Sequence, residues 1–266
     1  MPTTYAHDLF GKKVYKLLPE EMKRVVYRNR DLYRIGQHGP DILFYFCLGV
    51  NPVTRFGVMM HQEKAADFFR RGMKIVRDEK DEALYGYLIG FACHYILDST
   101  CHPYINEMDH EGKVTHTLLE KEMDRELMLR TGKDPLVYHP SDCVVPRLKY
   151  AAVIHRALPG IPTRILFLSL KLMKFFTNLM VCNDGEKRRK LVMRFSFLGG
   201  KKVQGYLRDH FMKLHPDRSV QCYVDEALRL YDEALEKVPH MLRELSLLAE
   251  EDRNLPPEWF LNYKGK

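Results

Sequence analysis

The stretch Tyr87–Pro103, YLIGFACHYILDSTCHP, constrains this chain most, because it places metal-binding side-chain types at a helical repeat. His94, Asp98 and His102 fall four residues apart, and a four-residue step at about 100° per residue returns to nearly the same helix face. The three side chains should therefore project in one stripe over two helical turns. Packing alone does not explain such a stripe, so we interpret it as part of a metal site.

Other histidines and carboxylates in the first 120 residues extend this candidate site. His116 and Glu120 repeat the four-residue spacing, and Asp41 follows a Gly-Pro turn. Taken singly, Asp41 could be a helix N-cap and His7 a surface histidine. The full candidate set is His7, Asp41, His61, His94, Asp98, His102, His116 and Glu120. Eight ligands exceed what one tetrahedral zinc ion uses, and no Cys-x-x-Cys pair is present to close a structural site. We therefore expect two or three ions with open coordination positions.

The remaining pattern predicts an all-α fold, because few runs alternate as strands do and no Asn-Gly hairpin signal occurs. We expect a single multi-helix domain over 1–266, with a metal-binding helical core at 1–130 and a helical extension at 131–266 that completes the fold. Glu122 and Asp124 have no assigned role and should be helix-surface charges. The expected helices are 12–18, 20–33, 61–76, 82–102 (stopped by Pro103), 115–130, 147–157, 165–181, and a final helical seam over 224–248 that Pro239 breaks or kinks.

The positive charge of the chain is concentrated in one segment. The formal charge is +7, and residues 164–202 contain ten basic and two acidic residues. This asymmetry favours an anionic partner, so we expect peripheral contact with anionic membranes through 164–202 and no specific double-stranded DNA binding. Within this segment, 165–181 is very apolar but carries Lys171, Lys174 and Asn178 in one stripe. It is either a central helix with a polar edge or an interfacial helix. The absence of a signal-peptide pattern makes the cytoplasm the expected location.

The motif order resembles that of a known family. His94-x3-Asp98-x3-His102 followed by His116-x3-Glu120, and preceded by Gly39-Pro40-Asp41, His61 and an early His7, is similar to the zinc-dependent phospholipase C family. That all-helical superfamily includes single-strand nucleases and the catalytic domain of glycosylphosphatidylinositol-specific phospholipase D. The resemblance covers about residues 2–125, and the rest of the chain matches only in being helical.

The resemblance implies three zinc sites. One ion would be held by Asp41, His61, His94 and Asp98, and a second by His102, His116 and Glu120. A third would use His7, Asp98 as a bridge and the amino terminus of the chain. Two departures affect this assignment. Secreted relatives begin with a processed Trp, whereas here Met1 removal would leave Pro2. Three residues separate Asp98 from His102, where the bacterial phospholipases have five, and if His102 points elsewhere His110 is the substitute ligand.

The resemblance also implies hydrolysis of a phosphate ester, with a phospholipid head-group bond as the first expected substrate. Asp41 would orient or deprotonate the attacking water. Two alternatives remain: a nuclease-type phosphodiesterase acting on single strands, and a non-catalytic, membrane-associated protein stabilised by metal. An HD-type phosphohydrolase is disfavoured, because its motif needs a His-Asp dipeptide and the chain has one only at His7-Asp8.

Overall fold

A computed structural model describes residues 4–47, 49–181, 187–196 and 210–266. These residues form helices and connecting segments with no strand, which confirms the all-α class. The α-helices are α1 (Thr4–Leu17), α2 (Glu20–Arg28), α3 (Arg30–Gly36), α4 (Pro52–Gln62), α5 (Ala65–Glu79), α6 (Glu82–His110), α7 (His116–Arg130), α8 (Leu148–Ala157), α9 (Thr163–Leu179), α10 (Lys187–Ser196) and α12 (Gln221–Glu250). Short 3₁₀ helices are η1 (Gly39–Tyr45), η2 (Pro140–Cys143), η4 (Arg218–Val220) and η5 (Pro257–Phe260).

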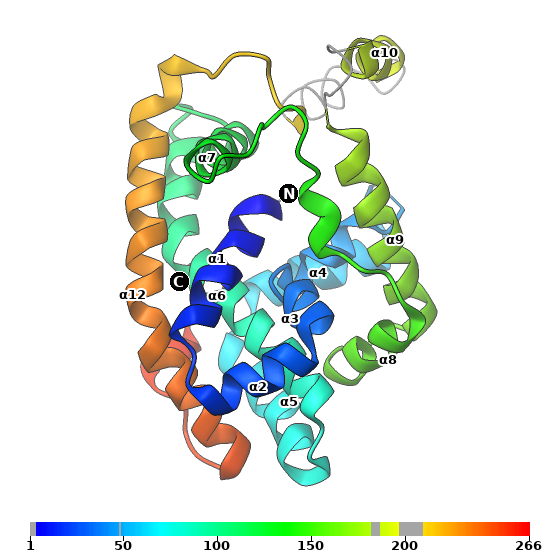
Figure 1. Ribbon diagram of the computed structural model, residues 1–266, viewed down its shortest axis with the longest axis vertical. Coiled ribbons are helices and arrows are strands. Elements are labelled where there is room, and N and C mark those ends of the chain that lie inside the picture. Colours follow the sequence, from blue (N-terminus) through cyan, green and yellow to red (C-terminus); the bar gives the residue numbers. More distant parts are fainter. Residues whose placement is uncertain (1–3, 48, 182–186, 197–209) are drawn as a thin grey trace.

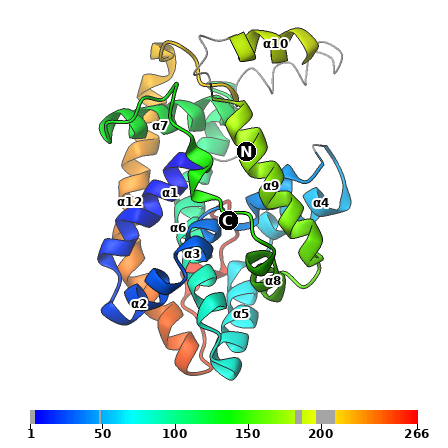
Figure 2. The same ribbon diagram turned by 45° about the vertical axis from the view of Figure 1, so that its right-hand side comes forward.

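Helix α6 runs through the middle of the molecule, and other helices pack around it (Figure 1). Every residue from 86 to 98 is buried, as expected of a helix whose apolar residues occur on all faces. Helix α12 runs alongside α6 in both views, and α7 lies across one end (Figure 2). Helices α8, α9 and α12, from the second half of the chain, contact elements of the first half. The division into a core at 1–130 and an extension at 131–266 stays a prediction.

Helices α3 and α6 approach each other at two glycines. A Cβ atom at Gly90 would lie 2.1 Å from the Tyr33 carbonyl oxygen, and one at Gly36 would lie 2.3 Å from the Tyr87 carbonyl oxygen. The two backbones are therefore in direct contact, which any larger side chain would prevent. Because η1 begins three residues after α3 ends, this contact places Asp41 beside the middle of α6.

The expected stop at Pro103 is wrong. Helix α6 continues through it to His110. A proline removes one backbone donor, so only the bond to the Ser99 carbonyl is lost. Cys101 and Ile105 are buried on either side, and this packing holds the flanking turns in helical conformation. Helix α12 likewise continues through Pro239, with Val238 and Met241 buried.

Three other helix boundaries differ from expectation. His61 does not begin a helix but lies in the last turn of α4, which starts at Pro52. The Asn51 side chain accepts hydrogen bonds from the backbone N–H groups of Val53 and Thr54, and the Thr54 side chain accepts one from the Asn51 backbone N–H. This capping box begins the helix at Pro52, earlier than the apolar pattern indicates. The helix expected over 20–33 is divided between α2 and α3 at Asn29, whose side chain donates to the Val25 carbonyl. The first helix begins at Thr4 rather than at residue 12.

Helix α9 buries one face and exposes another. Leu166, Leu170 and Met173 are buried, and Lys174 Nζ donates to the Val144 carbonyl at 3.2 Å. The helix therefore packs on the core by one face, and contact of its other face with a membrane stays a prediction. Residues 182–186 and 197–209 of the basic segment lie outside the described residues. No helix in the described part of the chain has the length and hydropathy needed to cross a membrane.

Candidate metal centre

Five helical elements bring the eight predicted ligands together near the middle of α6. His94, Asp98 and His102 come from α6 itself, and the other five residues come from its neighbours. These are His7 on α1, Asp41 on η1, His61 on α4, and His116 and Glu120 on α7. Contacts of 3.0–3.8 Å between nitrogen and oxygen atoms link all eight residues into one network.

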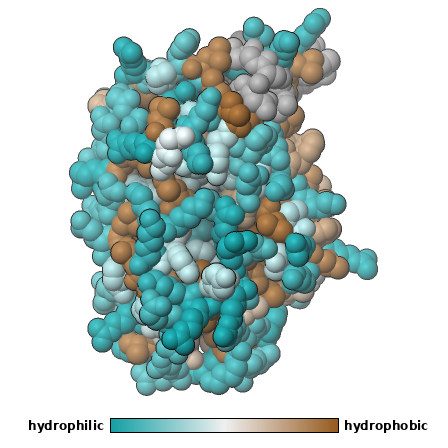
Figure 3. All heavy atoms as spheres, in the orientation of Figure 1, coloured by the Kyte–Doolittle hydropathy of each residue, from teal (hydrophilic) through white to brown (hydrophobic). Residues whose placement is uncertain are grey.

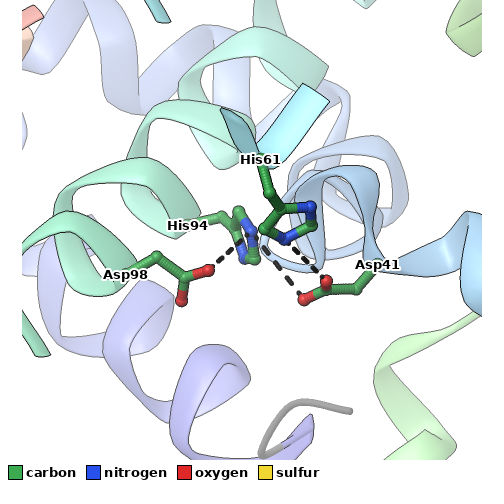
Figure 4. Close-up of side chains that lie close together, drawn as sticks. All are labelled: Asp41, His61, His94 and Asp98. Carbon is green, nitrogen blue, oxygen red and sulfur yellow. Dashed lines mark ion pairs between the residues drawn. The ribbon is translucent and has the colours of Figure 1, made fainter. Parts of the chain in front are cut away.

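The first group, shown in Figure 4, consists of Asp41, His61, His94 and Asp98, all buried. Asp41 Oδ1 lies 3.1 Å from His61 Nε2, and Asp41 Oδ2 lies 3.8 Å from His94 Nε2. Asp98 Oδ2 lies 3.2 Å from His94 Nε2. Four atoms bound at zinc's usual distance would be about 3.3 Å apart in a tetrahedron. One ligand atom from each residue lies within 4.8 Å of the others, so the group could hold a metal ion with small adjustments.

Gly39 allows Asp41 and His94 to approach. Its φ is +47°, and a Cβ atom there would lie 2.2 Å from His94 Cδ2. Both the backbone conformation and the space therefore require glycine. The Gly-Pro pair that marked a turn in the sequence has this second, steric function.

The second group consists of His102, His116 and Glu120. Glu120 Oε1 lies 3.0 Å from His116 Nε2 and 3.4 Å from His102 Nε2. His110, the substitute ligand, is exposed at the end of α6. The geometry thus favours His102 over His110.

Asp98 connects the two groups. Its Oδ1 lies 3.3 Å from His7 Nε2, while its Oδ2 lies 3.5 Å from His102 Nδ1. This position suits the bridging carboxylate that the resemblance implies. The amino terminus expected at the third site lies outside the described residues, so that site stays a prediction.

Hydrogen bonds behind the candidate ligands orient two of the imidazole rings. His61 Nδ1 lies 2.7 Å from the Gly57 carbonyl oxygen, and because a carbonyl only accepts, Nδ1 must be the donor. His116 Nδ1 lies 3.2 Å from Asn106 Oδ1 in the same arrangement. Each ring therefore directs Nε2 toward a carboxylate, as metal-binding histidines commonly do. The Phe44 ring stacks on His61 with centroids 5.3 Å apart.

The carboxylates of the site are ionised at neutral pH. Burial favours the neutral carboxyl, but the nearby histidines outweigh it and hold the pKa values of Asp41, Asp98 and Glu120 below their usual range. Burial lowers the pKa of His94 to about 4, so its ring is neutral at pH 7. Burial also lowers the pKa of His102, yet Asp98 and Glu120 raise it to about 9.

These three buried carboxylates have histidines as their ionic partners. Among the described residues they pair only with histidines and with no lysine or arginine. Both nitrogens of His94 and one oxygen each of Asp41, Asp98 and Glu120 are buried without a hydrogen-bond partner in the described part of the chain. Buried groups of this kind are costly unless a ligand satisfies them, so the donor set fits divalent metal, zinc included.

A cavity of about 230 Å³ opens beside both groups. Four of its lining residues were not predicted from the sequence: Phe44, Val58, Asn106 and Lys264. Asn106 lies one turn beyond His102 on α6, so the helical repeat could have indicated it had α6 not been expected to end at Pro103. Lys264 lies more than 140 residues along the chain from Glu120, and no local pattern connects it to the site.

Glu122 and Asp124 are buried, which contradicts their expected place on a helix surface. Glu122 Oε2 accepts a hydrogen bond from Arg125 Nε at 3.0 Å. Asp124 Oδ1 accepts one from the Ala6 backbone N–H at 2.8 Å, in the first turn of α1. A carboxylate is favourable at a helix N-terminus, and this bond fixes the turn that carries His7.

The fold and the two ligand groups together define a class of protein, an all-helical protein with a largely buried centre of histidines and carboxylates that could hold metal. The sequence model of the family described as zinc dependent phospholipase C matches residues 6–158. The chain therefore belongs to the zinc-dependent phospholipase C family. The matched region contains all eight candidate ligands but not Lys264. Searches of curated proteins and of solved structures each find no match.

Proposed function

We propose that this protein hydrolyses phosphate esters of the phospholipid head-group type, using two or three zinc ions held by the eight candidate ligands. The observation that carries the proposal is the pairing of the two ligand groups with a cavity that both of them line. Zinc ions bound there would make water a stronger nucleophile and stabilise the charge of a phosphoryl group.

Asp41 is the residue we assign to water activation. It lines the cavity, and its Oδ2 is buried without a hydrogen-bond partner among the described residues. Since its pKa is held below the usual range by His94 and His61, the carboxylate is ionised at neutral pH and can accept a proton from water. Its Oδ1 faces His61 Nε2 at 3.1 Å, which keeps the carboxylate in place.

The cavity suits a phosphoryl group with part of its ester rather than a whole lipid. Its volume of about 230 Å³ equals several water molecules at about 30 Å³ each. Phe44 and Val58 supply an apolar wall beside the polar ligands. The acyl chains of a phospholipid would therefore remain outside, in the membrane from which the head group enters.

An exposed stripe on α9 supports the peripheral membrane contact that this substrate requires. Arg164, Leu168, Lys171 and Phe175 are exposed at three- and four-residue intervals. Phe175 is 59% exposed and Leu168 40% exposed, so the stripe combines two apolar with two basic side chains. Figure 3 shows hydrophobic and hydrophilic side chains interspersed on the face drawn. Basic and apolar residues side by side are typical of surfaces that bind anionic membranes.

The single-strand nuclease alternative needs aromatic residues on which bases could stack. Phe44 is the one aromatic residue lining the cavity in the described part of the chain, and it already stacks on His61. Tyr45 is buried elsewhere in the core. These observations favour a phospholipid over a nucleic acid.

The test is hydrolysis by zinc-loaded protein of three substrates: a chromogenic phosphodiester, a phospholipid in mixed micelles and a single-stranded oligonucleotide. We expect cleavage of the first two. Asp41→Asn, which keeps the shape of the side chain but removes the base, should lower kcat at least about 100-fold. Asp67→Asn, an exposed change on α5, is the control and should leave activity unchanged. Zinc binding and binding to anionic vesicles without any cleavage would instead support the non-catalytic alternative.

A further inference from the structure

The cavity beside the candidate metal ligands contains one amine. Lys264 is the one lysine or arginine that lines it among the described residues, together with the carboxylates of Asp41 and Glu120. No ion pair or hydrogen bond within the described part of the chain engages its ammonium group, and the backbone N–H donates to Asn262 Oδ1. The charge thus remains available to a ligand in the cavity.

The segment that carries Lys264 is anchored to α6. Tyr95 donates from its hydroxyl to the carbonyl oxygens of Glu258 and Leu261, at 2.5 and 3.1 Å. The Trp259 ring stacks on Tyr95 with centroids 5.4 Å apart. Trp259 and Tyr95 are both buried, so the segment is part of the core rather than a loose extension.

The two neighbours of Lys264 are also held in place. Tyr263 is buried, with its ring centroid 5.5 Å from that of His61. Gly265 has φ of +70°, and a Cβ atom there would lie 2.6 Å from both Pro103 Cγ and the Ser99 carbonyl oxygen. In an uninterrupted helix, residue 103 would donate to this carbonyl, which proline cannot do. Gly265 therefore packs on the interruption that Pro103 makes in α6.

We propose that Lys264 is a substrate-binding residue whose ammonium pairs with a non-bridging oxygen of a negatively charged phosphate ester in the cavity. This inference rests on the function proposed above and specifies the charge of its substrate. Without metal, the carboxylates lining the cavity repel an anion, so an ammonium on the cavity wall adds attraction for it. Lys264 lies outside residues 6–158, so the family match itself assigns it no role.

The test measures binding of inorganic phosphate to zinc-loaded protein by titration calorimetry, together with zinc content. Lys264→Met should weaken phosphate binding about 10-fold, because a charge-assisted contact is lost, while zinc content stays at the wild-type value. Lys264→Arg, which keeps the charge, should restore most of the affinity. Lys266→Met removes an equal charge from an exposed position two residues away and should change affinity less than about twofold. For a chromogenic phosphodiester, Lys264→Met should raise KM by a similar factor with little change in kcat.

A second variant tests the placement of Lys264. Gly265→Ala keeps the ammonium but displaces the segment from Pro103, and it should weaken phosphate binding as Lys264→Met does. Wild-type phosphate affinity in Lys264→Met would overturn the inference, as would a parallel loss of zinc, which would indicate a structural role. Because phosphate binding needs no turnover, the two proposals are separable. If phosphate binding depends on Lys264 but the protein has no hydrolase activity, only the proposed function is rejected. If the protein hydrolyses phosphodiesters and Lys264→Met leaves hydrolysis unaffected, only this inference is rejected.

Discussion

His7 Nε2 lies 3.3 Å from Asp98 Oδ1, so the first described helix of the chain meets the central helix at the candidate metal centre. The imidazole rings of His7 and His94 are tilted by 31° to each other, with centroids 4.7 Å apart. Asp98 thus has imidazole groups on both of its oxygens, and it contacts residues of both ligand groups. The predictions below follow from this arrangement.

The second ligand group distinguishes His102 from His110. We predict that His102→Ala lowers the zinc content by about one equivalent, since three protein ligands are the usual minimum for a zinc site. His110→Ala should leave the zinc content unchanged, because His110 is exposed at the end of α6. Elemental analysis of the two purified variants makes the comparison. The reverse result, zinc loss in His110→Ala alone, would require a different α6–α7 geometry.

Gly39 sets the approach of η1 to His94. We predict that Gly39→Ala weakens zinc binding about 10- to 100-fold, because the added methyl group would displace the His94 ring and Asp41 cannot keep its position. Gly112→Ala is the matched control, since Gly112 also has a positive φ but no atom lies within 4 Å of its Cβ position. Competition with a chromogenic chelator measures both affinities. Equal zinc affinity in the two variants would contradict the steric role of Gly39.

Asp124 should lower the stability of the protein as the pH rises above about 4. Burial raises the pKa of this carboxyl to about 6, above its usual value near 3.8. Its contribution to stability is therefore complete below about pH 4 and is lost as the pH rises through 6, by roughly 2–3 kcal/mol in total. Asp124→Asn keeps an acceptor for the Ala6 N–H but has no charge to bury. We compare the free energies of unfolding of variant and wild type in metal-free protein. The value of the variant minus that of wild type should be larger at pH 8 than at pH 4.

Chemical denaturation at the two pH values measures this difference. Asp252→Asn, an exposed change, should show no pH-dependent effect. A constant difference between Asp124→Asn and wild type at both pH values would mean that Asp124 is already ionised, or already neutral, throughout the range.

Local periodicity predicted the parts of the site that lie on one helix. The four-residue spacing of His94, Asp98 and His102 correctly placed their side chains on one face of α6, and the same rule placed His116 and Glu120 on one face of α7. Their role as ligands stays a prediction. The family resemblance was confirmed, and the matched region extends further than the motifs indicated.

Features that depend on contacts between distant segments could not be predicted. A proline normally ends a helix, but α6 continues through Pro103 to His110 because Cys101 and Ile105 are buried on either side of it. Asp124 was expected to be a surface charge because its partner, the Ala6 backbone N–H, lies 118 residues away and no local sequence pattern indicates the contact. Lys264 reaches the cavity only because Tyr95, Pro103 and their neighbours hold the segment 256–266 against α6.

The most direct test of the central claim is the zinc content of Asp98→Ala, measured by elemental analysis after metal stripping and reloading. If Asp98 bridges ions as its contacts with His7, His94 and His102 indicate, wild type should hold about two to three equivalents and the variant at least about one fewer, with hydrolysis abolished. Asp109→Ala, an exposed change on the same helix, should match wild type. Full zinc content and full turnover in Asp98→Ala would contradict the account.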